Sequence, residues 1–209
     1  MNKLVIFLLL TLMVGSACKN KAKTDAPASD VTKIEQPKPS VFSAEESEKY
    51  VNKGKSIANA SFMALSGNLK KAMKAGGPTN AVKFCNTKAS ILVDSLMKAH
   101  HASIRRTTDK VRSGANQPTK IEQEQLAIYK KQIADNQPLK PVAVPMDGDK
   151  VQFFAPMKMK AVCLKCHGVV GETMKESDNN FIKEMYPADQ ATGYSEGQFR
   201  GIWSIQFDR

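Results

Sequence analysis

The chain has 209 residues, 42% hydrophobic and 7% aromatic, which is enough for one domain with its own core. Basic residues outnumber acidic ones and give a formal net charge of +11. This charge suits a solvated lysine-rich surface, anionic lipid or an acidic partner protein. Nucleic acid is not an expected partner, because no run of Lys and Arg is interleaved with aromatic residues.

Residues 1–17 are predicted to be a signal peptide. A basic start precedes an apolar run from Leu4 to Val14, which is too short to span a bilayer as a helix. Small residues lead to Cys18, which lies where a bacterial lipoprotein has its lipid-acceptor cysteine, although Gly15 stands where Leu is usual. We therefore expect an exported chain on the periplasmic side of a bacterial membrane, anchored by a lipid on Cys18. The alternative is ordinary cleavage nearby, with Cys18 incidental.

Residues 18–42 are predicted to be a lipidated flexible tether. They are rich in Lys, Ala, Pro, Ser and Asp and contain few large apolar side chains. Such a segment cannot bury enough surface to offset the entropy of ordering it. Residues 43–209 are then expected to form a single domain.

Two long helices are predicted to open this domain. Ser43 and Glu46 form a capping-box pattern, and apolar residues follow at helical spacing as far as Gly76-Gly77-Pro78, which ends the first helix. The second helix carries an apolar face that consists of Cys85, Ala89, Leu92 and Leu96.

The second half of the domain combines strands with helices. The predicted elements are a strand within residues 100–112, a helix opened by Thr119 and Glu122, a hairpin around Asp147-Gly148, a short helix at 180–185 and a last strand at 199–207. This order predicts an α+β domain with an antiparallel sheet and helices packed on one side.

The stretch VCLKCHG, residues 162–168, predicts a haem site. Cys163, Cys166 and His167 form Cys-X-X-Cys-His, the attachment pattern of c-type haem. Each thiol can add to one vinyl group of a porphyrin, and the imidazole is then held under the iron. A redox Cys-X-X-Cys has no need of the histidine, and a structural zinc site normally has a second ligand pair, which the chain lacks. The expected cofactor is therefore haem c with its iron, attached to Cys163 and Cys166 and bound axially by His167.

Cys85 is left without a partner, and two interpretations are open. Free cysteine is among the most buried residue types, so Cys85 could simply belong to the core. It could instead be the sixth iron ligand. The other candidates for that ligand are His100, His101, Met146, Met157 and Met159.

Three stretches, in this order, resemble the c-type haem-binding family with a PAS-like fold, known as domain of unknown function 3365. They are AVKFCNTKA (81–89), CLKCHG (163–168) and YPADQATGYSEGQFRGIWSI (186–205). The resemblance covers roughly Ser43 to the C-terminus and implies a PAS-like antiparallel sheet with the haem packed against it. It also implies that the axial ligands are His167 and Cys85.

The sequence departs from this family pattern at two places. Arg112-Ser113-Gly114-Ala115-Asn116 replaces an Arg-Asn-Pro-X-Asn turn, and Gln198 and Phe199 precede the late Arg-Gly pair where the family tends to have Asp. Both departures concern the details of the pocket.

Several arginines are candidates for pairing with the haem propionates, because a guanidinium matches a carboxylate well. Those that lie in or beside family-like segments, Arg112 and Arg200, rank first. The others are Arg105 and Arg106. Tyr194 could donate a hydrogen bond into the pocket. A structural role is the alternative for each of these residues.

Three functions fit these features. The first is a redox sensor or a sensor of a gas such as NO or CO with His/Cys-ligated iron, because a thiolate that detaches with redox state is a usable switch. The alternative is a periplasmic electron-transfer cytochrome with a basic docking face. An enzyme is less favoured, because no residue marks an acid–base group at the distal side. The expected partners are haem, the membrane through the lipid anchor, and a redox or signalling protein of unknown identity.

Overall fold

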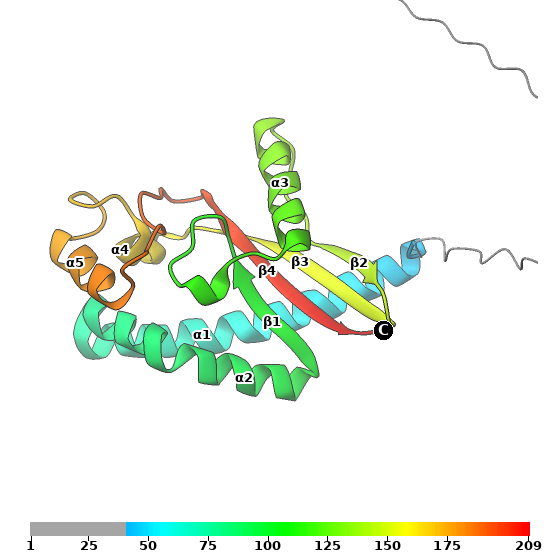
Figure 1. Cartoon of the computed structure of the whole chain (residues 1–209), viewed down its shortest axis with the longest axis horizontal. Helices are drawn as coiled ribbons and strands as arrows, with labels where there is room; N and C mark the ends of the chain where they lie inside the picture. Colours follow the sequence, from blue (N-terminus) through cyan, green and yellow to red (C-terminus); the bar gives the residue numbers. More distant parts are fainter. Residues whose placement is uncertain (1–40) are drawn as a thin grey trace, which may run out of the picture. The chain divides into compact units, whose positions relative to one another are not determined.

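The computed structural model describes residues 41–209 (Figure 1). The predicted signal peptide, Cys18 and nearly all of the predicted tether lie outside the described residues. Within the described part, no helix combines the length and the hydropathy needed to cross a bilayer.

The first predicted helix forms, and its helical backbone is interrupted at Gly76 and Gly77, where the sequence predicts its end. Helix α1 (Ala44–Thr87) therefore consists of two segments, one on each side of these glycines. It begins with the capping box, in which Ser43 Oγ accepts the Glu46 N–H at 3.1 Å and the Glu46 carboxylate accepts the Ser43 N–H at 2.9 Å. Its course breaks at Gly77, where φ is +67°. The chain turns back there, and the second segment of α1 leads into α2 (Ala89–His100), as Figure 1 shows.

The strands form one antiparallel sheet. Its strand order is β1-β4-β3-β2, so the last strand of the sequence lies between the first and the third. The predicted hairpin is confirmed and joins β2 to β3. The bounds are β1 (Ala102–Thr107), β2 (Val142–Met146), β3 (Lys150–Lys158) and β4 (Phe199–Asp208).

Helices α1 and α2 cover one face of this sheet. Ile104, Ile205 and Phe153 lie side by side on three neighbouring strands and face these helices. Ile57 of α1 belongs to the same buried cluster. The approach is closest at Gly54, where a Cβ atom would come 2.2 Å from the Phe153 ring.

The opposite face of the sheet is covered by α3 (Lys120–Ala134). Leu126 and Tyr129 of this helix form a second buried cluster with Phe154 and Ile202. These two strand residues alternate with those that face α1, so β3 and β4 bury apolar side chains on both faces. The α3 face is mixed, because it also buries Gln152 and Ser204, and the Gln152 side-chain amide donates to the Ser204 hydroxyl at 2.9 Å. The expectation that helices pack on one side only is therefore wrong, whereas the α+β class with long N-terminal helices is confirmed.

Two of the four short helices, α4 (Leu164–His167) and α5 (Glu176–Met185), lie near the place where α1 turns back (Figure 1). There Val82 of α1 packs with Met174 and Ile182. The other two short helices are η1 (Gly114–Asn116) and η2 (Ala161–Cys163).

Candidate functional site

The Cys-X-X-Cys-His segment folds as η2 followed at once by α4. Cys163 and Cys166 are therefore one helical turn apart and on the same side. Both are half-buried, and neither forms a disulfide. Gly168 follows the last helical residue, and its lack of a side chain leaves room for Thr173, whose Oγ1 would lie 2.0 Å from a Cβ atom at this position. The segment thus presents two free thiols side by side in a tightly closed turn.

The loop before β4, residues 186–198, fixes the position of His167. Its Nδ1 lies 2.7 Å from the Ala191 carbonyl oxygen, which can only accept, so Nδ1 carries the proton and Nε2 keeps its lone pair. The Tyr194 N–H donates to the His167 carbonyl at 3.0 Å. Burial, and then the charge of Arg112, hold the pKa of His167 well below its usual value. A neutral imidazole with a free Nε2 is the form that binds a metal.

Arg112 forms hydrogen bonds both to this loop and to the Cys-X-X-Cys-His turn, Cys163 to His167, which is called the cysteine turn below. Its Nη2 donates to the Cys166 carbonyl at 2.5 Å. Its Nε and Nη2 donate to the two carboxylate oxygens of Asp189 at 3.2 and 3.1 Å. The Asp189 side chain is 0% exposed, so this is a buried bidentate ion pair. The guanidinium expected at a propionate is therefore already engaged with protein groups.

Cys85, in the second segment of α1, is exposed, which does not match a place in the core. Burial nevertheless raises the pKa of its thiol, against the lowering effect of Arg106 and Arg112. The pKa of Cys166 rises to about 11, chiefly through burial, and Cys85 adds to this rise. The structure therefore brings Cys85 near the cysteine turn.

Arg106 and Arg200 lie beside this group without a carboxylate within 4.0 Å among residues 41–209. The Arg106 guanidinium lies 5.6 Å from the Trp203 ring, and that of Arg200 lies 5.3 Å from the Tyr194 ring. Burial lowers the pKa of both guanidinium groups, and the charge of Arg200 lowers the pKa of Arg106 further. Two cations that repel each other at one place in the fold favour an anionic ligand there.

Other predicted residues are placed elsewhere. Arg105 lies on the α3 side of the sheet, where its Nε donates to the Glu122 carboxylate at 3.1 Å. His101 and Met146 lie at the hairpin end of the sheet, away from the cysteine turn. Met157 lies opposite Gly201, near Trp203 and on the same sheet face, and it remains an alternative ligand. The two further sequence candidates are His100, the last residue of α2, and Met159, which is buried.

The Arg-Gly pair at the start of β4 has a clear structural reason. Met157 and Lys158 of β3 pair with Gly201 and Phe199, so Arg200 is an extra residue that bulges from the ladder. Gly201 has φ +147°, and a Cβ atom there would lie 2.3 Å from the Thr107 carbonyl oxygen. The glycine lets the end of β1 approach, and the bulge directs Arg200 out of the regular sheet.

Sequence reasoning missed two residues of this group. Asp189 holds Arg112 and accepts the Ala191 N–H at 2.9 Å. Tyr186 lies close enough to Cys85 for that thiol to contribute, after burial, to raising the pKa of the Tyr186 hydroxyl. Both residues lie in the stretch 186–205, and their presence in a family-like motif was the available signal.

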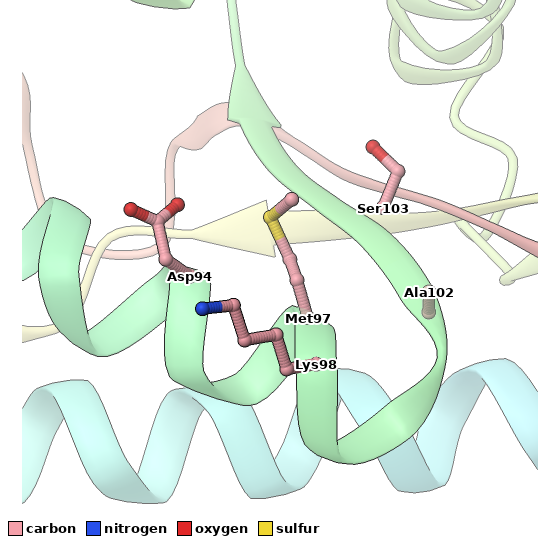
Figure 2. Close-up of a pocket in the computed structure, with 5 residues that line it drawn as sticks. All are labelled: Asp94, Met97, Lys98, Ala102 and Ser103. Carbon is pink, nitrogen blue, oxygen red and sulfur yellow. The ribbon is translucent and has the colours of Figure 1, made fainter.

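Two surface hollows in the described part lie apart from these thiols. One is bounded by the end of α2 and the start of β1, and the residues that line it are Asp94, Met97, Lys98, Ala102 and Ser103 (Figure 2). The other lies between the end of α3 and the loop before β4. Neither contains Cys85, Cys166 or His167.

The fold and the site define an α+β domain in which a helical turn-back and a Cys-X-X-Cys-His turn meet at one end of an antiparallel sheet. Residues 25–207 match the Tll0287-like family, and the chain belongs to that family. This confirms the predicted family resemblance.

One solved structure similar to this chain is that of the cyanobacterial heme-protein Tll0287. The sequences are 20% identical, the TM-score is 0.53, and the match covers 80% of this chain and 98% of that chain. At this identity, the match shows a shared fold. A search of curated proteins finds no match.

Proposed function

We propose that this chain is a monohaem c-type cytochrome domain that senses redox state or a gas such as NO or CO. The observation that carries the proposal is the meeting of two free thiols, a histidine with a free Nε2 and a further cysteine at one end of the sheet. The similar solved structure is that of a heme-protein, which supports the same cofactor here. A bound haem would supply a redox-active iron.

The residues fit such a group. Cys163 and Cys166 would hold it covalently, since their thiols share one side of a helical turn. His167 would bind iron through Nε2, because Nδ1 already donates to a carbonyl. Arg106 and Arg200 would pair with the propionates, because they are the nearby guanidinium groups without a carboxylate partner in the described chain.

Cys85 would provide the second axial ligand. Metal binding would release its proton, which the raised thiol pKa otherwise retains. A thiolate donates electron density and favours ferric iron, so we expect a low reduction potential.

The two axial residues are restrained to different degrees, and this difference favours a sensor. His167 is held by hydrogen bonds from its ring and its carbonyl to the loop before β4. The Cys85 thiol has no hydrogen bond within residues 41–209, and its helix segment lies between the break at Gly77 and an irregular residue, Lys88, with φ −117°. A ligand on the less restrained element can leave while the other stays, which is the requirement for a ligand-exchange switch.

Periplasmic electron transfer is the second candidate function. Lys110 and Lys160 direct their ammonium groups at the Tyr194 and Phe62 rings, at 4.7 and 4.9 Å, rather than at carboxylates. They leave positive charge around the site, which suits an acidic redox partner. A carrier would keep both axial ligands in both redox states.

Absorption spectra of the oxidised and reduced protein, exported by a host with haem-ligation machinery, test the proposal. We expect one attached haem by mass and a low-spin ferric spectrum. Cys85→Ala should shift the Soret band and yield a high-spin or water-ligated form, whereas Met157→Leu, which removes the alternative ligand, should not. Binding of NO or CO by the reduced protein supports the sensor, and reversible reduction without ligand change supports the carrier. A mature chain without an added haem mass contradicts both.

We propose further that the chain is exported and tethered to the membrane by a lipid on Cys18, with a separate redox or signalling protein as its partner. The support is the sequence of residues 1–18, with its basic start, apolar run and small residues before the cysteine. Cys18→Ala should release the protein from the membrane fraction and abolish incorporation of labelled fatty acid. A membrane-free wild-type protein with an unmodified Cys18 would contradict the anchor.

A further inference from the structure

The hydrogen bonds behind His167 lead to a buried carboxylate. The His167 Nδ1–H donates to the Ala191 carbonyl at 2.7 Å, and the Ala191 N–H donates to Asp189 Oδ1 at 2.9 Å. Asp189 also accepts both bonds from Arg112, and its side chain is 0% exposed. The amide and the carbonyl of Ala191 flank one Cα atom, so the bond that holds its N–H also restrains the direction of its carbonyl.

Arg112 acts on the same carbonyl from another side. Its Nη2 lies 3.4 Å from the Ala191 oxygen and 2.5 Å from the Cys166 oxygen. A positive charge at this place draws electron density from the oxygen that His167 uses as its acceptor. The carboxylate of Asp189, bidentate on Arg112, offsets that charge.

We propose that Asp189 is the positioning residue of His167: through the Ala191 backbone and Arg112 it fixes the ring orientation and the Nδ1–H tautomer, and it strengthens Nε2 as an electron donor. The inference rests on the proposed function, in which Nε2 binds iron. Partners one step behind a metal-binding histidine commonly set its tautomer and basicity in this way. Asp189 does so here across a backbone carbonyl rather than by direct contact.

The chain offers a matched control on the other face of the sheet. Glu122 is also a buried carboxylate, 3% exposed at its side chain, and it pairs with Arg105 at 3.1 Å. It belongs to the α3 side, so it does not touch the loop that holds His167. Glu122→Gln therefore removes the same kind of ion pair without altering the surroundings of the imidazole.

The test compares the full-length wild type with Asp189→Ala, Asp189→Asn and Glu122→Gln. In haem-bearing protein, both Asp189 variants should raise the midpoint potential and lower the low-spin fraction, and Asp189→Ala should have the larger effect. Glu122→Gln should match the wild type in both measurements. If Asp189→Ala does not accumulate as folded protein, the Asp189→Asn comparison decides alone.

The outcomes separate this inference from the proposed function. Haem-bearing Asp189 variants that match Glu122→Gln in potential and spin state overturn the role of Asp189 and leave the proposed function standing. A wild type isolated without haem overturns the proposed function. In that case the ¹⁵N shifts of the His167 imidazole still decide the inference: a mixture of tautomers in Asp189→Ala supports it, and an unchanged Nδ1–H tautomer refutes it.

Discussion

Helix α1 lies closest to the sheet at Gly54, and two glycine substitutions in this helix can test that contact. Gly54 and Gly67 both have helical backbone in the first segment of α1. Alanine at Gly54 would place its Cβ 2.2, 2.3 and 2.7 Å from three atoms of the Phe153 ring. Alanine at Gly67 would meet no atom within 4 Å. The two changes thus differ in packing and share the same backbone effect.

The expected magnitudes follow from these distances. In a helix, Gly→Ala stabilises by about 0.5–1 kcal/mol, and Gly67→Ala should show this gain in full. With alanine at position 54, the Phe153 ring must move away by roughly 1 Å to restore an ordinary contact. Phe153 is fully buried beneath α1, so its ring has little room to move. Overpacking of this kind costs about 1–3 kcal/mol, so Gly54→Ala should be destabilised by about 1–2 kcal/mol.

Thermal unfolding followed by circular dichroism measures the difference. A gap of about 1.5–3 kcal/mol between the two variants corresponds to about 3–12 °C in Tm for a domain of this size. Equal Tm values, or a higher Tm for Gly54→Ala, would refute the close packing of α1 on β3. The contact matters for the site because the same helix continues through the Gly77 turn to the segment that carries Cys85.

Three further predictions concern the site and the ion pair behind the sheet. Gly201→Ala should lower stability by about 3 kcal/mol or more, because its Cβ would lie 2.3 Å from a backbone carbonyl, and denaturant unfolding that matches the wild type would contradict this. Double substitution of Cys163 and Cys166 by Ala should abolish covalent haem, and a haem band that survives denaturing electrophoresis would argue otherwise. Burial opposes ionisation of Glu122, but the Thr119 amide, Ser204 and Arg105 hold its pKa below the usual 4.5. The ionised Glu122 therefore contributes its full stabilisation above about pH 4.5, and this stabilisation is lost as the pH falls through the pKa of the folded state. Between neutral and acidic pH, the Tm of Glu122→Gln should fall less than the Tm of the wild type. Parallel profiles of Tm against pH would exclude this linkage.

The elements that the sequence predicted correctly depend on signals within a few residues. The capping boxes at Ser43 and Thr119 and the hairpin around Asp147-Gly148 all form as expected. In each case the residues that form the structural contact are the same neighbouring residues that form the sequence pattern. The same holds for the thiols of the Cys-X-X-Cys-His turn, which a single helical turn places on one side.

The remaining features depend on strand register and on distant partners. Arg105 and Arg106 are adjacent in sequence, yet one faces α3 and the other faces the helices that carry Cys85. A shift of one residue in the pairing of β1 with β4 would exchange them, and no local pattern fixes that register. The ion pair of Arg112 with Asp189 joins residues 77 positions apart, which explains why the sequence offered a structural role for Arg112 only as an alternative to a haem propionate and named no partner for it.

The convergence of three arginines at one end of the sheet follows from the geometry of β1 and β4. Gly201 has no side chain to clash with the Thr107 carbonyl, so β1 and β4 stay close at the edge of the sheet where β1 ends and β4 begins. Arg106 at the end of β1 and Arg200 in the β4 bulge thereby come together, and their charges act on each other. Asp189 pairs directly with Arg112, the third cation of the group, and acts on Arg200 only at longer range, so neither Arg106 nor Arg200 has a carboxylate within 4.0 Å in the described chain. The fold therefore retains two positive charges beside the histidine and thiol groups, which favours a ligand with two carboxylates at this end of the sheet.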